Sequence, residues 1–421
     1  MDIIVLGAGI IGVTTAWYLR QNGHNVRVVE RRPEPGLETS FANAGQVSAH
    51  LADPWANPST LRTVFDWLLH DDTPLVFRPQ ADIHQWTWLA KFLRECVQSR
   101  YHQNLIHLAN LGVYSRTALQ TLRADIGIDY DGRQNGILLF FTDADRLRAA
   151  AGAARKLAAY GIKREVLSAQ ECLDLEPSLQ SVGNSLQGGV YSRGDETGDA
   201  FKFTQRLAER ARQAGVVFHY GASLQEIKTG KSGVDAVDIV FSDGRKETCR
   251  AQHYVLCLGS ATAAQARKIG ISLDIYPVKG YSVTLPVLPD SLACRMGLTD
   301  AGRKIAFSRL GDRVRATGFA EIANFDTSID TARCQQLQDR AMALFPDALD
   351  AAQASHWAGL RPMTPSNLPY IGRSRYPNLL INAGHGTIGW TQSCGSALAI
   401  SEILENRAPA CDFPFLGQAR H

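Results

Sequence analysis

The stretch that constrains this chain most is DIIVLGAGIIG, residues 2–12. Ile3–Leu6 form a short apolar run of the kind found in a buried parallel strand. Three glycines follow: Gly7 permits a tight turn, Gly9 lets the backbone approach a pyrophosphate, and Gly12 lets the next helix pack against the strand. This order predicts a dinucleotide site, and these residues alone fit NAD, NADP and FAD.

The next strand narrows the choice of dinucleotide. NVRVVE ends in Glu30, eighteen residues after Gly12, where a carboxylate accepts hydrogen bonds from a ribose. Glu30 would repel a 2′-phosphate, which weighs against NADP although Arg31 and Arg32 follow it. NAD and FAD both stay open at this point.

Composition and charge exclude several classes of protein. The 421 residues are 45% hydrophobic and 20% charged, as in a globular enzyme of one large domain or two. The net charge is +3 and no basic block occurs, which argues against nucleic acid as a partner. The eight cysteines form no C-x-x-C and no metal-ligand spacing, so we expect reduced thiols and no metal. We expect a cytoplasmic protein, because neither a signal peptide nor an apolar run of membrane-spanning length is present.

Residues 199–260 favour FAD over NAD. Asp199 is placed to cap a helix that is followed by a strand, three further strand-like runs with an Asp243-Gly244 hairpin turn, and a returning apolar strand at 253–260. A helix, a strand, an antiparallel meander and a returning strand are typical of the glutathione-reductase type of FAD domain. A nicotinamide dehydrogenase would more usually repeat strand and helix.

The remaining segments predict a second, β-rich domain. Residues 55–122 are predicted to be largely helical, with Trp55, Trp67, Trp86 and Trp88, and the face formed by Ile83, Trp86, Leu89 or Ala90, and Leu93 is interpreted as core. A partner subunit or a membrane surface is the alternative for that face. Antiparallel patterns begin at 275, and residues 379–407 read as strand, glycine loop and helix.

Several motifs in this order resemble the FAD-dependent D-amino acid dehydrogenases, relatives of D-amino acid oxidase, glycine oxidase and sarcosine oxidase. They are VLGAGIIG, ETSFANAGQVS, RGDETGD, YPVKGYSVT, WAGLRPMTPSNLPYIG and NAGHGTIGWTQSCGS. The resemblance implies a mixed α/β and α+β fold. An FAD-binding domain with a parallel sheet and a three-stranded meander would comprise 1–60, 195–270 and 356–421. A substrate-binding domain on an antiparallel sheet would comprise 61–194 and 271–355.

The resemblance also implies the cofactor contacts. FAD is expected to be non-covalent, because no cysteine lies in or near GLRPMTP, where sarcosine oxidases attach the flavin. The implied contacts are Gly7, Gly9, Ile10, Ile11, Gly12, Glu30, Arg31, Ser40, Asn43, Ala44, Gly45, Gln46, Val47, Gly259, Gly384, His385, Gly386, Thr387, Ile388, Gly389, Trp390 and Thr391.

Four residues are predicted at the substrate. The planar fork of Arg361 suits a carboxylate, and the arginine of G-L-R-P binds the substrate carboxylate in the relatives. Tyr281 and Tyr276 are further candidates for substrate contacts. His50 stands in QVSAH where close relatives usually read QxSPG, which makes a cyclic substrate such as cis-4-hydroxy-D-proline attractive.

The implied activity is oxidation of D-amino acids by hydride transfer from Cα to FAD, giving an imino acid that hydrolyses to a 2-oxo acid and ammonia. Helix-start N–H groups in GHGTIGWT would stabilise the reduced flavin, with no dedicated base. Electrons would pass to a non-oxygen acceptor such as a quinone, with peripheral contact at the inner face of the cytoplasmic membrane. Alternatives are a glycine or sarcosine oxidase using O₂, an RNA-modifying flavoprotein, and a non-catalytic flavin module.

Overall fold

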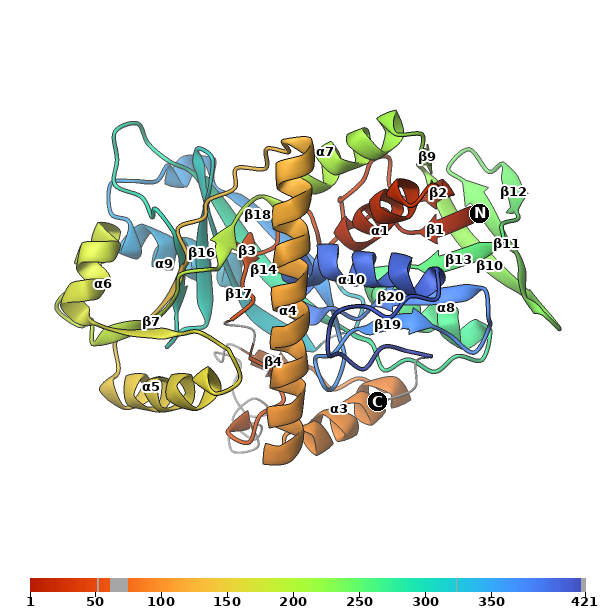
Figure 1. Cartoon of the computed structure of the whole chain (residues 1–421). Helices are drawn as coiled ribbons and strands as arrows, with labels where there is room; N and C mark the ends of the chain where they lie inside the picture. Colours follow the sequence, from red (N-terminus) through yellow and green to blue (C-terminus); the bar gives the residue numbers. More distant parts are fainter. Residues whose placement is uncertain (51–52, 61–74, 323, 418–421) are drawn as a thin grey trace.

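The glycine-rich N-terminus forms the centre of a six-stranded sheet in a computed structural model, which describes residues 1–50, 53–60, 75–322 and 324–417. The sheet lies on the right of Figure 1 and is parallel except at β19. Its strands in spatial order are β19 (Tyr370–Arg373), β20 (Leu379–Ala383), β13 (His253–Leu256), β1 (Asp2–Leu6), β2 (Asn25–Val29) and β9 (Val217–His219).

Helices cover one face of this sheet. Apolar side chains of β1 and β2 share one core with those of four helices, which bury small and apolar residues against the strands. These helices are α1 (Ile10–Gln21), α4 (Gln98–Ile126), α7 (Ala200–Gln213) and α10 (Gly389–Leu404). Asp199 caps α7 as predicted, because its carboxylate accepts from the N–H groups of Phe201 and Lys202.

The predicted meander covers the other face. It consists of β10 (Ala222–Gly230), β11 (Gly233–Phe241) and β12 (Lys246–Cys249), and it shares a second core with α8 (Thr262–Lys268). The Asp243-Gly244 turn joins β11 to β12, and Gly244 has a φ of +85°. The prediction of a three-stranded meander is confirmed.

A nine-stranded, mainly antiparallel sheet forms the other half of the molecule (Figure 1, left). Its strands in order are β18 (Ser355–Met363), β14 (Tyr276–Pro286), β17 (Arg313–Ile322), β16 (Ile305–Leu310), β15 (Gly297–Asp300), β5 (Ile137–Phe141), β7 (Gly188–Ser192) and β6 (Glu165–Ser168), with β4 (Leu75–Phe77) beside β17. Helix α9 (Thr331–Leu344) shares its core. The predicted combination of a parallel and an antiparallel sheet is confirmed.

Short elements complete the described chain. Two-residue strands β3 (Gln46–Val47) and β8 (Glu196–Thr197) pair with each other. The other helices are α3 (Ile83–Glu95), α5 (Ala144–Ala158) and α6 (Ala169–Leu175), and the 3-10 turns are η1 (Pro177–Val182), η2 (Gly259–Ala261), η3 (Ala351–Gln353) and η4 (Gly386–Ile388). No helix among these residues is long and apolar enough to span a membrane.

The predicted apolar face of α3 is wrong. Ile83 is 72% and Trp86 46% exposed, while the helix buries Gln85, Trp88 and Phe92. The Gln85 amide donates to two backbone carbonyls, and the Trp88 indole donates to a third. A polar side chain that satisfies buried carbonyls breaks the apolar periodicity on which the prediction rested. Trp67 lies outside the described residues.

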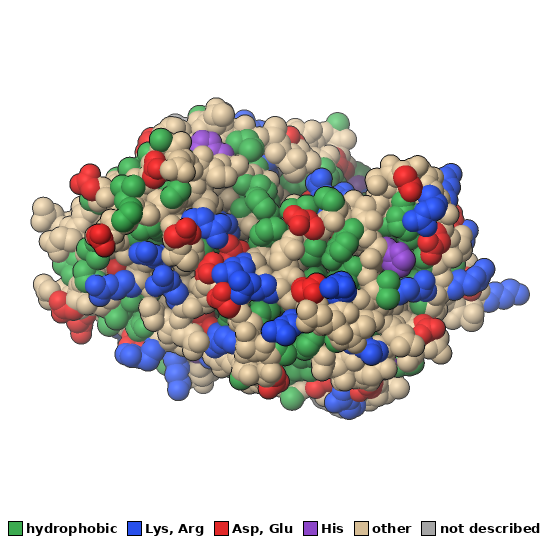
Figure 2. Space-filling view, turned by 90° about the horizontal axis from the view of Figure 1, so that it is seen from above, with side chains coloured by type: hydrophobic (Ala, Val, Ile, Leu, Met, Phe, Trp, Pro, Cys, Tyr) green, Lys and Arg blue, Asp and Glu red, His purple; other side chains and the backbone are tan. Residues whose placement is uncertain are grey.

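The expectations of reduced thiols and of a surface without a basic block agree with the structure. All eight cysteines are free, and seven are buried. Positive and negative side chains are interspersed on the face shown in Figure 2, without a block of one sign. In the described part of the chain no group of His, Cys, Asp and Glu is arranged to hold a metal ion.

Candidate active site

A cavity of about 410 Å³ lies where the carboxyl ends of β1, β2, β13 and β20 face strands β14 and β18. Ligands of open α/β sheets bind at the carboxyl ends of strands. The predicted residues that line it are Gly7, Gly9, Ile10, Ile11, Glu30, Arg31, Ser40, Asn43, Ala44, Gly45, Gln46, Gly259, Arg361, Gly384, His385, Gly386, Thr387, Gly389 and Trp390.

The glycine turn has the geometry that a phosphate requires. Gly7 has a φ of +105°, and a Cβ on Gly12 would lie 1.8 Å from the carbonyl oxygen of Gly7, so the close approach of helix and strand needs both glycines. The N–H groups of Ile11 and Gly12, at the start of α1, donate to no acceptor in the described residues. Free N–H groups at a helix start form an anion site.

Glu30 is held at the end of β2 by two backbone donors. One carboxylate oxygen accepts from the N–H of Ala8 at 2.7 Å, and the other accepts from the N–H of Arg32 at 2.8 Å. The guanidinium groups of Arg31 and Arg32 both pair with Glu38. The arginines after Glu30 therefore have a carboxylate partner already, and the Glu30 carboxylate is oriented for further donors such as ribose hydroxyls.

The loop after Glu30 is tied to the glycine turn. The hydroxyl of Ser40 accepts from the N–H of Ile10 at 3.0 Å, and the side chain of Asn43 accepts from the N–H of Gly45 at 2.9 Å. Val47, in contrast, is buried outside the cavity lining. Residues 40–46 therefore close one side of the cavity as a preformed loop.

The C-terminal glycine loop supplies the opposite wall. Gly384 and Gly386 have φ values of +87° and +55°, and His385 lies between them, 2% exposed. Burial lowers the pKa of His385 to about 3, so its imidazole is neutral. Ile388 and Thr391 lie outside the lining, and the hydroxyl of Thr391 accepts from the N–H of Ser48.

Three buried polar atoms of the cavity lining have no hydrogen-bond partner in the part of the chain that the structure describes. They are Nε2 of His385, Oδ1 of Asn382 and Oε1 of Gln265. Buried polar groups are normally paired, so each of these atoms calls for a bound group. Together with the free N–H groups at α1, they fit a long polar cofactor such as FAD.

Arg361 is a half-buried cation without a counter-ion among the described residues. It lies on β18, and its Nη1 donates to the carbonyl of Phe319 at 2.8 Å and, more weakly, to that of Lys279 at 3.5 Å. No carboxylate of the described residues pairs with it, and burial lowers its pKa to about 10. Nε and Nη2 are left for an anion in the cavity.

Tyr281 and Tyr276 are absent from the lining of the cavity that contains Arg361. Tyr281 lines a neighbouring cavity of about 690 Å³, and its hydroxyl donates to Glu321 at 3.1 Å. The Tyr276 hydroxyl donates to Asp82 at 3.3 Å, and its ring packs against Trp88. Both are buried, and their contact with substrate stays a prediction.

His50 also lies outside the lining of both cavities. It is 7% exposed, its N–H donates to Asp195, and its carbonyl accepts from Arg164 at 2.7 Å. Burial and the nearby charge of Arg116 lower its pKa to about 4. Its role in substrate choice stays a prediction.

Sequence reasoning missed several residues of the lining. Gln265 and Asn382 carry two of the unpartnered atoms, Gly280 lies against the guanidinium of Arg361, and Trp357 also lines the cavity. Gly280 stands in the quoted segment VKGYS, whereas Gln265 belongs to a short helix without a motif. Cys257 is the one cysteine of the lining, and burial raises its pKa to about 12, which keeps it a thiol and a poor nucleophile.

Comparison with known sequences covers almost the whole chain. Residues 2–403 match the family described as FAD dependent oxidoreductase. The chain is 46% identical over 416 residues to a D-amino acid dehydrogenase of Dechloromonas aromatica, covering 99% of this chain and 100% of that protein. It is 42% identical over 421 residues to a D-amino acid dehydrogenase of Allorhizobium ampelinum, covering 100% and 99%.

Solved structures show the same fold. Glycine oxidase from Geobacillus kaustophilus matches with a TM-score of 0.76 at 23% identity, over 98% of this chain and 96% of that one. L-proline dehydrogenase from P. horikoshii matches with a TM-score of 0.72 at 15% identity, over 96% and 93%. The chain therefore belongs to the FAD-dependent oxidoreductase family, in its D-amino acid dehydrogenase group, and its cofactor is FAD.

Proposed function

We propose that this protein oxidises D-amino acids and passes their electrons to a non-oxygen acceptor such as a quinone. The observation that carries the proposal is Arg361, a half-buried guanidinium that faces the cavity and has no carboxylate partner among the described residues. A cation withdrawn from water in this way is stabilised by an anion, and an amino acid supplies a carboxylate. The two curated relatives, named D-amino acid dehydrogenases, support the choice of substrate class.

The substrate is held by its carboxylate in this proposal. Nε and Nη2 of Arg361 form one edge of a planar fork, which binds a carboxylate through two parallel hydrogen bonds. This contact fixes Cα in one orientation inside the cavity. Bound FAD would supply the acceptor for the hydride that leaves Cα, and the imino acid would hydrolyse to a 2-oxo acid and ammonia.

In this proposal the protein contributes to catalysis by orienting the substrate and by stabilising negative charge in the cavity. His385 is neutral and its Nε2 has no partner among the described residues, so this atom can hydrogen-bond without adding charge. The start of α10 at Gly389 directs N–H groups and the positive end of the helix dipole toward the glycine loop, where they would stabilise negative charge. We assign no dedicated base.

We propose that FAD is held non-covalently along both walls. The N–H groups at α1 would take the pyrophosphate and Glu30 the ribose. The flavin end would be contacted by the residues of the two loops that line the cavity: Ser40, Asn43, Ala44, Gly45, Gln46, Gly384, His385, Gly386, Thr387, Gly389 and Trp390. The domain division proposed from the sequence is kept with one change: β18 is hydrogen-bonded to β14, so we place it with the substrate domain.

A peripheral membrane location at the inner face of the cytoplasmic membrane is also part of the proposal. Ile83 and Trp86 are exposed on α3, and apolar side chains of this kind enter a lipid interface. Sedimentation with anionic lipid vesicles tests this. Binding lost in Ile83→Ser/Trp86→Ser, but kept in a second exposed apolar pair, Leu288→Ser/Leu292→Ser, supports it; equal binding by both variants overturns it.

Anaerobic reduction of the flavin tests the main proposal. The purified protein is mixed with D- and L-amino acids, glycine, sarcosine and both 4-hydroxy-D-prolines, and the flavin absorbance is followed. We expect fast bleaching by D-amino acids that is lost in Arg361→Ala and kept in Arg309→Ala, a half-buried arginine on β16. Bleaching by glycine or sarcosine alone would identify an amine oxidase instead. Preference for cis-4-hydroxy-D-proline would identify the cyclic substrate.

A further inference from the structure

Strand β14 lies between β18, which carries Arg361, and β17. Strand β17 has one residue more than β14 over part of their pairing. Lys279 of β14 pairs with Glu321 of β17, but Tyr281 pairs with Gly318, so two steps along β14 correspond to three along β17. Phe319 lies within this β-bulge and has a φ of +56°, a left-handed conformation that an aromatic residue rarely adopts. Strained backbone that persists at a site calls for a function.

The bulge directs a carbonyl to Arg361. In a regular ladder the carbonyl of a central strand bonds to a neighbouring strand, whereas a bulge leaves one residue unpaired. Here the carbonyl of Phe319 accepts from Nη1 of Arg361 at 2.8 Å. The carbonyl of Lys279 approaches the same nitrogen at 3.5 Å. One nitrogen of the guanidinium is therefore held, and Nε and Nη2 stay free.

Gly280 provides the space in which the guanidinium lies. A Cβ built on Gly280 would be 2.2 Å from Cζ and Nη2 of Arg361 and 2.3 Å from Nη1. Gly280 is absent from the residues with positive φ, so its backbone conformation alone does not require glycine. Glycine is required at residue 280 because the guanidinium of Arg361 occupies the space that a Cβ would fill.

We propose that the Phe319 bulge and Gly280 are positioning elements that aim the free edge of Arg361 into the cavity. This inference rests on the proposed role of Arg361 as the carboxylate clamp. Without the carbonyl of Phe319, Nη1 would have a single weak acceptor, and the fork could rotate. With a methyl group at residue 280, the guanidinium would be displaced from its present position.

The first test is a double-mutant cycle on the holoenzyme. Gly280→Ala, Arg361→Met and the double variant are compared in kcat/KM for D-alanine and in the dissociation constant for acetate, followed through the flavin absorbance. We expect Gly280→Ala to raise KM and the acetate constant at least about tenfold, with kcat changed less, and to have no further effect beside Arg361→Met. Ser282→Ala is the control and should behave as wild type, because Ser282 lies two residues along the same strand and its hydroxyl has no partner among the described residues.

The second test separates the bulge from the ring of Phe319. Phe319→Gly keeps the carbonyl and favours positive φ, so acetate binding should stay within about twofold of wild type. Phe319→Val opposes that φ and should weaken acetate binding, with FAD content unchanged.

The outcomes distinguish two failures. If Arg361→Met leaves the KM for D-alanine unchanged, the proposed function of Arg361 is wrong. If Arg361→Met weakens binding but Gly280→Ala does not, or if their effects simply add, only the positioning inference is overturned. Equal loss in Phe319→Gly and Phe319→Val would assign the effect to the ring rather than to the bulge.

Discussion

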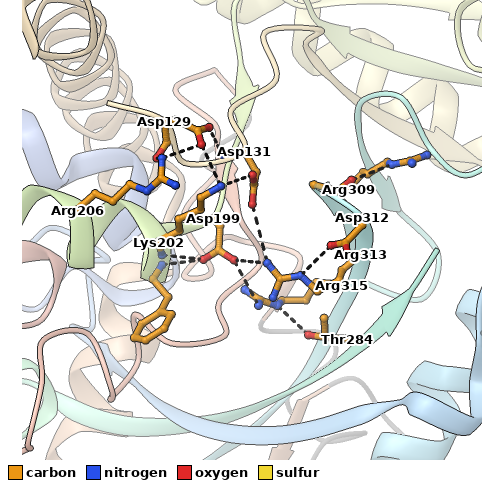
Figure 3. A network of polar contacts seen from close by, with 12 residues as sticks. Asp129, Asp131, Asp199, Lys202, Arg206, Thr284, Arg309, Asp312, Arg313 and Arg315 are labelled. Carbon is orange, nitrogen blue, oxygen red and sulfur yellow. Dashed lines mark hydrogen bonds and ion pairs between the residues drawn. The ribbon is translucent and has the colours of Figure 1, made fainter. Parts of the chain in front are cut away.

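Arg315, on the antiparallel sheet, lies 3.9 Å from Asp199, the residue that caps α7 over the parallel sheet (Figure 3). Asp199 also pairs with Arg313 at 3.2 Å. One carboxylate thus satisfies a helix start and pairs with two cations from the other half of the molecule. Asp199 therefore links the half of the molecule that contains the parallel sheet to the half that contains the antiparallel sheet.

The same arginine reaches the cofactor loop. Nε of Arg315 donates to the hydroxyl of Thr284 at 3.0 Å, and Nη1 donates to the carbonyl of Asn43 at 3.3 Å. Asn43 lines the cavity. Arg315 is 4% exposed, and although burial lowers its pKa to about 10, it keeps its charge at neutral pH and is stabilised by these partners.

Arg315→Met is expected to loosen this loop. Loss of a buried partner leaves Asp199 with Arg313 alone, which we expect to cost roughly 3 kcal/mol of unfolding free energy. FAD should also dissociate faster, because the carbonyl of Asn43 loses its donor. Urea unfolding and release of flavin fluorescence measure the two effects. Arg309→Met, on the neighbouring strand and outside this pair, is the control; equal losses in both variants would contradict the prediction.

Gly12→Ala should abolish FAD binding. The new methyl group would overlap the carbonyl of Gly7, so α1 would have to move away from β1 and the N–H groups of its first turn with it. The ratio of flavin to protein absorbance and the Tm report the outcome. Gly152→Ala, in the middle of α5 with nothing within 4 Å, should instead stabilise by about 1 kcal/mol. A fully yellow Gly12→Ala protein would refute the prediction.

Glu30→Gln should weaken FAD binding while the fold is kept. The carboxylate accepts from two backbone N–H groups, and an amide offers one acceptor atom in place of two. Loss of a charged acceptor costs about 1–3 kcal/mol, or roughly 5- to 150-fold in Kd. Titration of the apoprotein with FAD measures this. The exposed Glu34→Gln should leave Kd unchanged, and an equal Kd for both variants would show that Glu30 takes no part.

His50 should make stability depend on pH. Its pKa is about 4 in the folded protein against about 6.5 when unfolded, so the unfolded chain binds the proton first as the pH falls. The stability contributed by neutral His50 is complete above about pH 6.5 and is lost toward pH 4. Urea unfolding should show wild type losing more stability than His50→Gln between pH 7 and pH 5, whereas the exposed His84→Gln should follow wild type.

The elements of the first βαβ unit and the start of α7 could be predicted because their causes are local. The turn at Gly7 needs a positive φ, Glu30 follows an apolar strand, and Asp199 directly precedes its helix. Each of these features depends on residues within a few positions. The prediction of the buried face of α3 was wrong because Gln85 is buried, and its amide is satisfied by two backbone carbonyls outside the helix.

The sequence by itself determined the glycine turn, the meander and the helix cap through local patterns, since glycine turns, apolar periodicity and caps act over short distances. Its resemblance to a known family implied the cofactor, the two sheets and most residues of the cavity wall. Only the tertiary structure decided which polar groups of the cavity lack hydrogen-bond partners and which residues from distant segments contact one another. Gly280, Phe319 and Arg361 come together through the pairing of three strands, and the bulge that aims the Phe319 carbonyl is a property of that pairing. Strand register depends on packing over the whole sheet, so no single segment of the chain encodes it.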